Sequence, residues 1–148
     1  MAQSLARVLI HIVYSTNRRM PSISRQTRPL LHGDLGGILR DLRCPPLAVG
    51  GTTDHVHLLF ALSRTISIAG AVEEVKTASS RWMKRQDAPS FAWQGGYGAF
   101  SVSESQAARV VRYIACQDTR HRRATFQDEF RALLQRHGVS CDERGVWD

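Results

Sequence analysis

One short stretch, Asp54–Phe60, constrains the fold of this chain more than any other segment. It has the alternation of a buried β-strand, in which side chains two positions apart point the same way. His55 and His57 then share one face, and the alternating residues Val56, Leu58 and Phe60 form an apolar face toward a core. Two imidazoles with Cβ atoms about 6.5–7 Å apart can converge on one metal ion, with a third ligand supplied from elsewhere. The alternative is a pair of structural histidines.

The rest of the chain alternates between strand-like and helix-like periodicity. The patterning predicts strands over residues 5–14, 47–51, 54–62 and 99–102. It predicts helices over residues 25–43, 67–85, 103–119 and 126–137. Because Gly50–Thr53 is a turn signal, the second and third strands are expected to form a hairpin.

This element order is β-α-β-β-α-β followed by two further helices, which is the ferredoxin-like split β-α-β arrangement. We therefore expect an α+β fold, a ferredoxin-like antiparallel sheet with two C-terminal helices, in one domain over residues 1–148. In the usual strand order of that fold, the first and third strands are the central pair. The histidine strand then lies mid-sheet, on a face that the helix over 103–119 can cover.

The helix expected over 103–119 carries two stripes of side chains. It should begin with a capping box, in which Ser103 is the N-cap and Gln106 follows three residues later. Its buried stripe comprises Ala107, Val110, Val111 and Ile114. A second stripe comprises Arg109, Tyr113 and Gln117, and the last two point together because they are one helical turn apart.

A further histidine, His11, stands among the apolar residues of the first strand. We interpret it as a core histidine whose hydrogen bonds are satisfied. The alternative is that His11 lies beside the candidate metal site, which requires the first and third strands to be neighbours.

The charge of the chain favours a polyanionic partner such as a nucleic acid. The net charge is +7, the pI is about 10.2, and all but two of the 20 basic residues are arginine, whose guanidinium suits phosphate. An arginine-rich proteome encoded by a GC-rich genome is the alternative explanation. The candidate DNA contacts are Arg18, Arg19, Lys76, Arg109, Arg120, Arg122 and Arg123. Three of these belong to the basic cluster Arg120–Arg123, which includes His121.

No membrane span or secretory signal is evident, so we expect a cytoplasmic protein that associates with the nucleoid when bound to DNA. The cysteines Cys44, Cys116 and Cys141 are widely spaced and odd in number. They predict reduced thiols, and neither a zinc knuckle nor a disulfide framework.

The histidine pair and the tyrosine helix together resemble a known family. His55-Val56-His57 followed by Tyr113-Ile114-x-x-Gln117 is similar to the single-tyrosine HUH transposases of bacterial insertion sequences of the 200/605 type, including relatives associated with repetitive extragenic palindromes. The likeness covers nearly the whole chain. Supporting segments are His11–Arg18, Ser79–Trp82, Trp93–Tyr97, His121–Arg123, Phe126–Phe130 and Trp147-Asp148.

The resemblance implies a transposase that cleaves single-stranded DNA at hairpin-bearing element ends and transfers the strand. It implies that His55, His57 and Gln117 hold Mg²⁺ or Mn²⁺, and that Tyr113 attacks phosphorus to give a 5′-phosphotyrosine intermediate. It also implies a homodimer in which the tyrosine helix of one subunit can serve the histidines of the other, and the short Asp118-Thr119 break expected after the helix would permit this. Tyr14 and Tyr97 are rival nucleophiles, but neither has a ligand one helical turn away.

Two other functions remain open from the residues alone. A relative that no longer cuts could bind hairpin DNA or RNA through the basic surface, although the intact set of His55, His57, Tyr113 and Gln117 argues against decay. A metal-dependent hydrolase could also use a His-x-His pair, but 148 residues are too few for the barrel that usually carries one.

Overall fold

The computed structural model describes residues 2–121 and 124–148, with the backbone alone at Arg120. The strands are β1 (Leu9–Ser15), β2 (Pro46–Gly51), β3 (His55–Ala61) and β4 (Gly98–Val102). The helices are α1 (Arg28–Asp41), α2 (Ile68–Lys84), α3 (Ala107–Ala115), α4 (Gln117–Arg120) and α5 (Phe126–Arg136), with 3₁₀ turns η1 (Asn17–Arg19) and η2 (Glu104–Gln106). None of the described helices is long and apolar enough to cross a membrane.

The strands form one antiparallel sheet in the order β2-β3-β1-β4. This order confirms the predicted ferredoxin-like arrangement, with β1 and β3 in the centre and β2 and β3 in a hairpin. In the register of the central pair, His57 stands opposite Val13, and His55 stands opposite Ser15. The histidine pair therefore lies near the point where the chain leaves β1.

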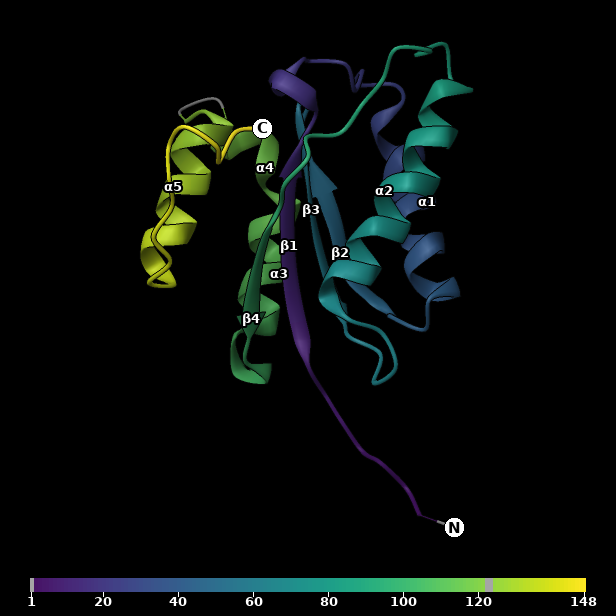
Figure 1. The fold of residues 1–148 in the computed structure, drawn as a ribbon, viewed down its shortest axis with the longest axis vertical. Helices are drawn as coiled ribbons and strands as arrows, with labels where there is room; N and C mark the ends of the chain where they lie inside the picture. The colour runs from purple at the N-terminus through teal and green to yellow at the C-terminus, as the bar shows by residue number, and fades with distance from the viewer. Residues whose placement is uncertain (1, 122–123) are drawn as a thin grey trace.

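Helices α1 and α2 lie on one side of the sheet (Figure 1). Ile12 of β1 and Leu58 of β3 point to this side and pack with Leu35 of α1 and Val75 of α2 in one continuous apolar core. Helix α2 begins where Ser67 accepts a hydrogen bond from the Gly70 amide at 3.0 Å, which satisfies an amide of the first turn.

Helices α3, α4 and α5 lie on the other side of the sheet (Figure 1). Here the apolar contacts divide into two clusters, one around Leu59 and Ile114 and the other around Val13 and Phe130. Polar side chains from the central strands are buried between the clusters: His11, His55 and His57. This face therefore buries three imidazoles, whereas the core on the α1/α2 face is mainly apolar.

Two glycines at the end of β2 bring the surrounding elements close together. Gly51 has a φ of 152°, and a Cβ there would collide with the carbonyl of His55. At Gly50 a Cβ would lie 2.6 Å from the carbonyl oxygen of Ile114. The absence of a side chain at Gly50 thus allows α3 to approach the sheet next to the histidine strand.

The first strand is shorter than predicted. It begins at Leu9, which pairs with Ala61, the last residue of β3. The preceding residues run away from the sheet (Figure 1), and Leu5 is 87% exposed. The Val8 carbonyl still accepts from the Leu62 amide at 2.7 Å, but residues 5–7 extend beyond the end of the partner strand.

The helix predicted over 103–119 is wrong in its extent and its cap. Ser103 makes no capping hydrogen bond, and residues 104–106 form the turn η2 before α3 begins. At Cys116 (φ −101°, ψ 22°) the chain departs from helical geometry, and α4 starts at Gln117. Tertiary contacts explain this break, because Gln117 hydrogen-bonds to His55 at 3.1 Å and Asp118 pairs with Arg28 at 2.8 Å. The break therefore precedes Asp118-Thr119, which lie within α4.

Candidate active site

The two histidines of β3 are fully buried side by side, as their i and i+2 spacing predicts. Both are 0% exposed, with ring centroids 5.2 Å apart. The Nδ1 atom of His55 lies 2.7 Å from Asp54 Oδ1 and 3.0 Å from Thr52 Oγ1. Its Nε2 donates to Gln117 Oε1 at 3.1 Å. The turn before β3 and the start of α4 thus fix the orientation of this ring.

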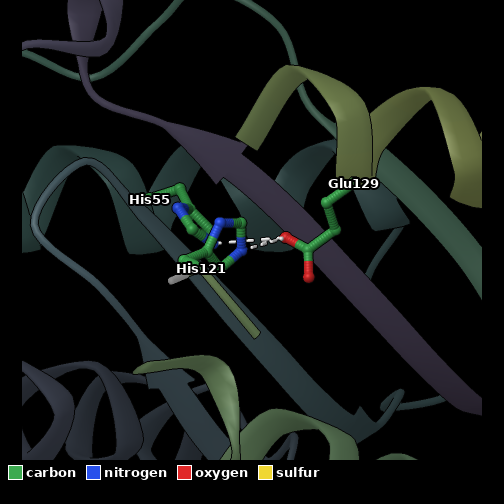
Figure 2. Close-up of side chains that lie close together, drawn as sticks. All are labelled: His55, His121 and Glu129. Carbon is green, nitrogen blue, oxygen red and sulfur yellow. Dashed lines mark hydrogen bonds and ion pairs between the residues drawn. The ribbon is translucent and has the colours of Figure 1, made fainter. Parts of the chain in front are cut away.

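A carboxylate from α5, that of Glu129, lies at the centre of the imidazoles. Its Oε1 is 3.0 Å from His57 Nε2, 3.0 Å from His121 Nε2 and 3.3 Å from His55 Nε2. Figure 2 shows the side chains of His55 and His121 turned toward this carboxylate. Glu129 is buried, so the polar contacts replace the water that it loses.

Tyr113 of α3 joins the cluster through the second oxygen of the same carboxylate. Its hydroxyl donates a hydrogen bond to Glu129 Oε2, and its ring centroid is 5.5 Å from that of His57. The rival tyrosines lie elsewhere. Tyr14 packs in the core under α1 and α2. Tyr97 is 38% exposed and lies beside Lys76. Of the three tyrosines, Tyr113 is the one beside the histidine pair.

His11 extends the cluster along the sheet. It is buried, and its Nε2 lies 2.9 Å from His57 Nδ1. The alternative interpretation, a place beside the candidate site, is therefore the correct one, and His11 is at the same time a core histidine with a hydrogen-bond partner. Burial and the neighbouring His57 lower the pKa of His11 to about 3, so this ring is neutral at pH 7.

Hydrogen bonds and burial have opposing effects on the pKa values of the groups in this cluster. Burial opposes the charged form of His55, but its hydrogen bonds to Asp54 and Glu129 outweigh burial and raise its pKa to about 9. Burial also opposes ionisation of Glu129, yet the hydrogen bonds from three imidazoles hold the pKa of this carboxyl well below its usual range. For His57 burial prevails, and its pKa is lowered. The cluster therefore holds an ionised carboxylate beside a protonated His55.

The donor set fits a divalent transition metal ion. Ligand atoms of His55, His121 and Glu129 all lie within 4.8 Å of one another. Imidazole nitrogens with a carboxylate oxygen are ligands that Mn²⁺ and its neighbours accept. Of the expected ligands, the structure brings His55, His57 and Gln117 together, with Gln117 coming from α4 instead of a continuous α3.

The sequence interpretation missed Glu129 and assigned His121 to a different role. Its place in the basic cluster Arg120–Arg123 predicts that His121 contacts phosphate, but its side chain turns inward to Glu129 and to the Ala124 carbonyl, 2.8 Å from its Nδ1. Glu129 had a detectable signal, because it is an acidic residue on the apolar stripe of the last helix, between Phe126 and Leu133. An acidic residue on a buried helix face needs partners.

The candidate DNA contacts have diverse surroundings. Arg18 is exposed in η1, and the guanidinium of Arg19 lies 5.9 Å from the centroid of the Trp147 ring. Lys76 is half-buried and donates to the carbonyls of Gln94 and Gly96 at 2.8 and 2.7 Å, so part of its hydrogen-bonding capacity is used internally. Arg109 is exposed on α3. Arg122 and Arg123 lie outside the described residues, as does the side chain of Arg120.

Comparisons with known proteins agree with the resemblance noted in the sequence. The family model described as "Transposase IS200 like" matches residues 4–117. A candidate transposase from Deinococcus radiodurans R1, known from a crystal structure, is 24% identical, with 79% of this chain and 98% of that chain covered and a TM-score of 0.61.

A second solved structure is a REP-associated tyrosine transposase bound to a REP hairpin. It is 16% identical, with 82% of this chain and 74% of that chain covered and a TM-score of 0.58. The likeness to both structures concerns the fold. A search of curated proteins gave no significant match. The match to the family model ends at Gln117, so α5 with Glu129 lies beyond it.

Proposed function

The chain belongs to the IS200-like transposase family, and we propose that it is a metal-dependent single-stranded DNA transposase with Tyr113 as nucleophile. The observation that carries this proposal is the contact between the Tyr113 hydroxyl and the Glu129 carboxylate, which also contacts His55, His57 and His121. A phenol, a carboxylate and three imidazoles thus meet in one buried centre.

The metal ligands in this proposal are His55, His57 and Gln117, with Glu129 and His121 within reach of the same ion. Bound Mg²⁺ or Mn²⁺ would polarise the scissile phosphate and offset the charge that develops in the transition state. Asp54 and Thr52 orient His55 through its Nδ1, and His11 orients His57 through its Nδ1. Partners of this kind fix the imidazole orientation around metal sites.

The chemistry assigned to Tyr113 is nucleophilic attack on phosphorus. A bond forms between the tyrosine oxygen and phosphorus while the bond from phosphorus to the 3′ oxygen breaks. The products are a 5′-phosphotyrosine and a free 3′-hydroxyl. The phenolic proton leaves along the hydrogen bond to Glu129 and passes on to solvent, while the departing 3′ oxygen takes up one proton from solvent, so that the step balances. Because the phosphotyrosine conserves the phosphodiester bond energy, attack by another 3′-hydroxyl rejoins DNA without ATP.

We further propose that the substrate is a DNA strand with a hairpin, since a relative with the same fold is bound to a REP hairpin. The homodimer expected from the resemblance remains part of the proposal. One chain already brings Tyr113 within 5.5 Å of its own His57, measured between ring centroids. We therefore propose that each subunit cuts with its own tyrosine.

A covalent-trapping assay tests this function. The protein is mixed with single-stranded oligonucleotides from the DNA that flanks its own gene, with Mn²⁺ or Mg²⁺, and run on a denaturing gel. We expect a protein–DNA adduct that disappears with EDTA and in Tyr113→Phe, while Tyr113→Phe retains DNA binding. Tyr97→Phe is the matched control and should form the adduct normally. Binding with no adduct on any flanking strand would instead indicate a hairpin-binding protein that does not cut.

A further inference from the structure

A groove opens beside Tyr113, between α3, α5 and the end of β4. Its volume is about 720 Å³, which is within the range of ligand sites. The buried His11 and the partly buried Tyr113 are among its lining residues, so the groove reaches the hydrogen-bonded cluster itself. Val110 of α3 and Leu133 of α5 provide apolar walls.

The charged side chains of the described residues that line this groove are all basic. Arg109 and Arg112 come from α3, and Arg136 comes from the last turn of α5. Among the residues that the structure describes, no aspartate or glutamate lines the groove. Within the described part of the chain, none of the three arginines forms an ion pair, in contrast to Arg7, Arg28, Arg131 and Arg144. The three guanidinium groups therefore remain available to an anionic ligand.

The approach to the cluster from the opposite side has a different charge. The second groove, about 600 Å³, is lined by Asp54, Asp118 and Asp128 together with Arg25 and Arg28. One of its two arginines is already paired, because Arg28 contacts Asp118 at 2.8 Å. A strand of phosphates would be repelled by these carboxylates and attracted by the unpaired arginines of the first groove.

We propose that the unpaired DNA strand next to the scissile phosphate lies in the groove between α3, β4 and α5, with its phosphates on Arg109, Arg112 and Arg136. This inference rests on the proposed function for the identity of its ligand. Guanidinium groups bind phosphate oxygens in a forked geometry, and the apolar walls suit the faces of unpaired bases. The groove would deliver a phosphodiester to Tyr113, which stands in its lining.

The native cysteines allow this groove to be tested by chemical labelling. Cys116 is exposed and lines the groove, Cys141 is exposed in the C-terminal tail, and Cys44 is buried. In the wild-type protein with EDTA, a saturating short oligothymidylate should slow alkylation of Cys116 by iodoacetamide severalfold and leave Cys141 unchanged, as followed by mass spectrometry. An unchanged rate at Cys116, with saturation verified by fluorescence anisotropy, would overturn the proposal.

Arginine variants provide a second, independent measurement. Arg109→Gln, Arg112→Gln and Arg136→Gln are combined in one protein. The control protein combines Arg40→Gln, Arg64→Gln and Arg81→Gln, which change the same charge at exposed positions on the α1/α2 side. For single strands, each lost phosphate contact lowers the slope of log affinity against log salt by about 0.7. We expect the magnitude of this slope to fall by about 2 in the groove variant and by well under 1 in the control. Equal losses would contradict the assignment.

These experiments distinguish a failure of the groove proposal from a failure of the proposed cleavage function. The two binding measurements need no cleavage, so they remain valid if the trapping assay finds no adduct, and a positive result would then describe a strand-binding groove on a protein that does not cut. Conversely, the adduct could form normally while oligothymidylate leaves Cys116 unprotected and the groove variant keeps the wild-type salt slope. These results would refute the proposed strand-binding groove and leave the proposed tyrosine transferase unaffected. Thermal unfolding of both triple variants verifies that each is folded.

Discussion

The two faces of the sheet differ in what they bury. The α1/α2 face is covered by one continuous apolar core. The α3/α5 face has two smaller apolar clusters, with histidines, Tyr113 and Glu129 between them. Burying polar groups costs free energy unless each one finds a partner. The apolar face can therefore stabilise the fold without special geometry, whereas the polar face needs specific hydrogen bonds and in return offers a site for chemistry.

The strongest test of this comparison uses neighbouring residues of β3, His57 and Leu58, which point to opposite faces. We expect His57→Ala to lower the rate of adduct formation by at least about a hundredfold. Loss of a metal ligand removes several kcal/mol of transition-state stabilisation, and each 1.36 kcal/mol is a factor of about ten. Single-turnover cleavage with Mn²⁺ measures this effect. Full cleavage by the variant would exclude His57 from the metal site.

Leu58→Ala should instead lower the stability of the fold and leave cleavage nearly unchanged. Leu58 is 1% exposed in the α1/α2 core, and truncation of a buried leucine costs about 2–5 kcal/mol of stability. The free energy of unfolding from urea titration should fall by that amount. Adduct formation per folded molecule should stay near the wild-type rate below the unfolding transition. A selective loss of cleavage with unchanged stability would mean that the two faces are not separable.

A smaller effect on stability is expected from Glu129→Gln, which keeps the shape of the side chain and removes its charge. His55, His57 and His121 then lose their shared anionic acceptor. Leaving buried groups incompletely paired costs about 1–3 kcal/mol. Glu104→Gln is the control, because its ion pair with Arg7 is exposed to solvent and should contribute little to stability. Equal urea midpoints for both variants would show that the polar cluster contributes little to stability.

The last test concerns the pH dependence of stability in metal-free protein. The folded pKa of His55 is raised from 6.5 to about 9, so the folded state binds this proton more tightly than the unfolded chain does. Its contribution to stability is complete below pH 6.5 and is lost as the pH rises to about 9. Urea unfolding in EDTA across this range measures the decline. Asp54→Asn replaces the carboxylate that raises this pKa by a neutral amide, and should flatten the decline. An equally steep decline in that variant would show that Asp54 does not raise the pKa of His55.

The local part of the site could be predicted from the sequence. His55 and His57 share a face because a strand repeats every two residues, and this holds whatever packs above them. The ferredoxin-like order followed from the sequence of periodic segments, and it correctly located the histidine strand in the middle of the sheet. Tyr113 and Gln117 were predicted to lie together from helical spacing. They do reach the same cluster, but across a break at Cys116 that helical periodicity cannot reveal.

The amino-acid sequence by itself determined which residues repeat on each strand and helix, because periodicity depends on backbone geometry alone. Only the tertiary structure decided that Glu129 meets the histidines, since the contact depends on how α5 packs over the sheet. It also decided that His121 turns inward and not toward solvent, and that the unpaired arginines of α3 and α5 line the same groove. The physical reason is range. Backbone periodicity acts over a few residues, whereas burial and electrostatic pairing act between segments that meet only after the chain has folded.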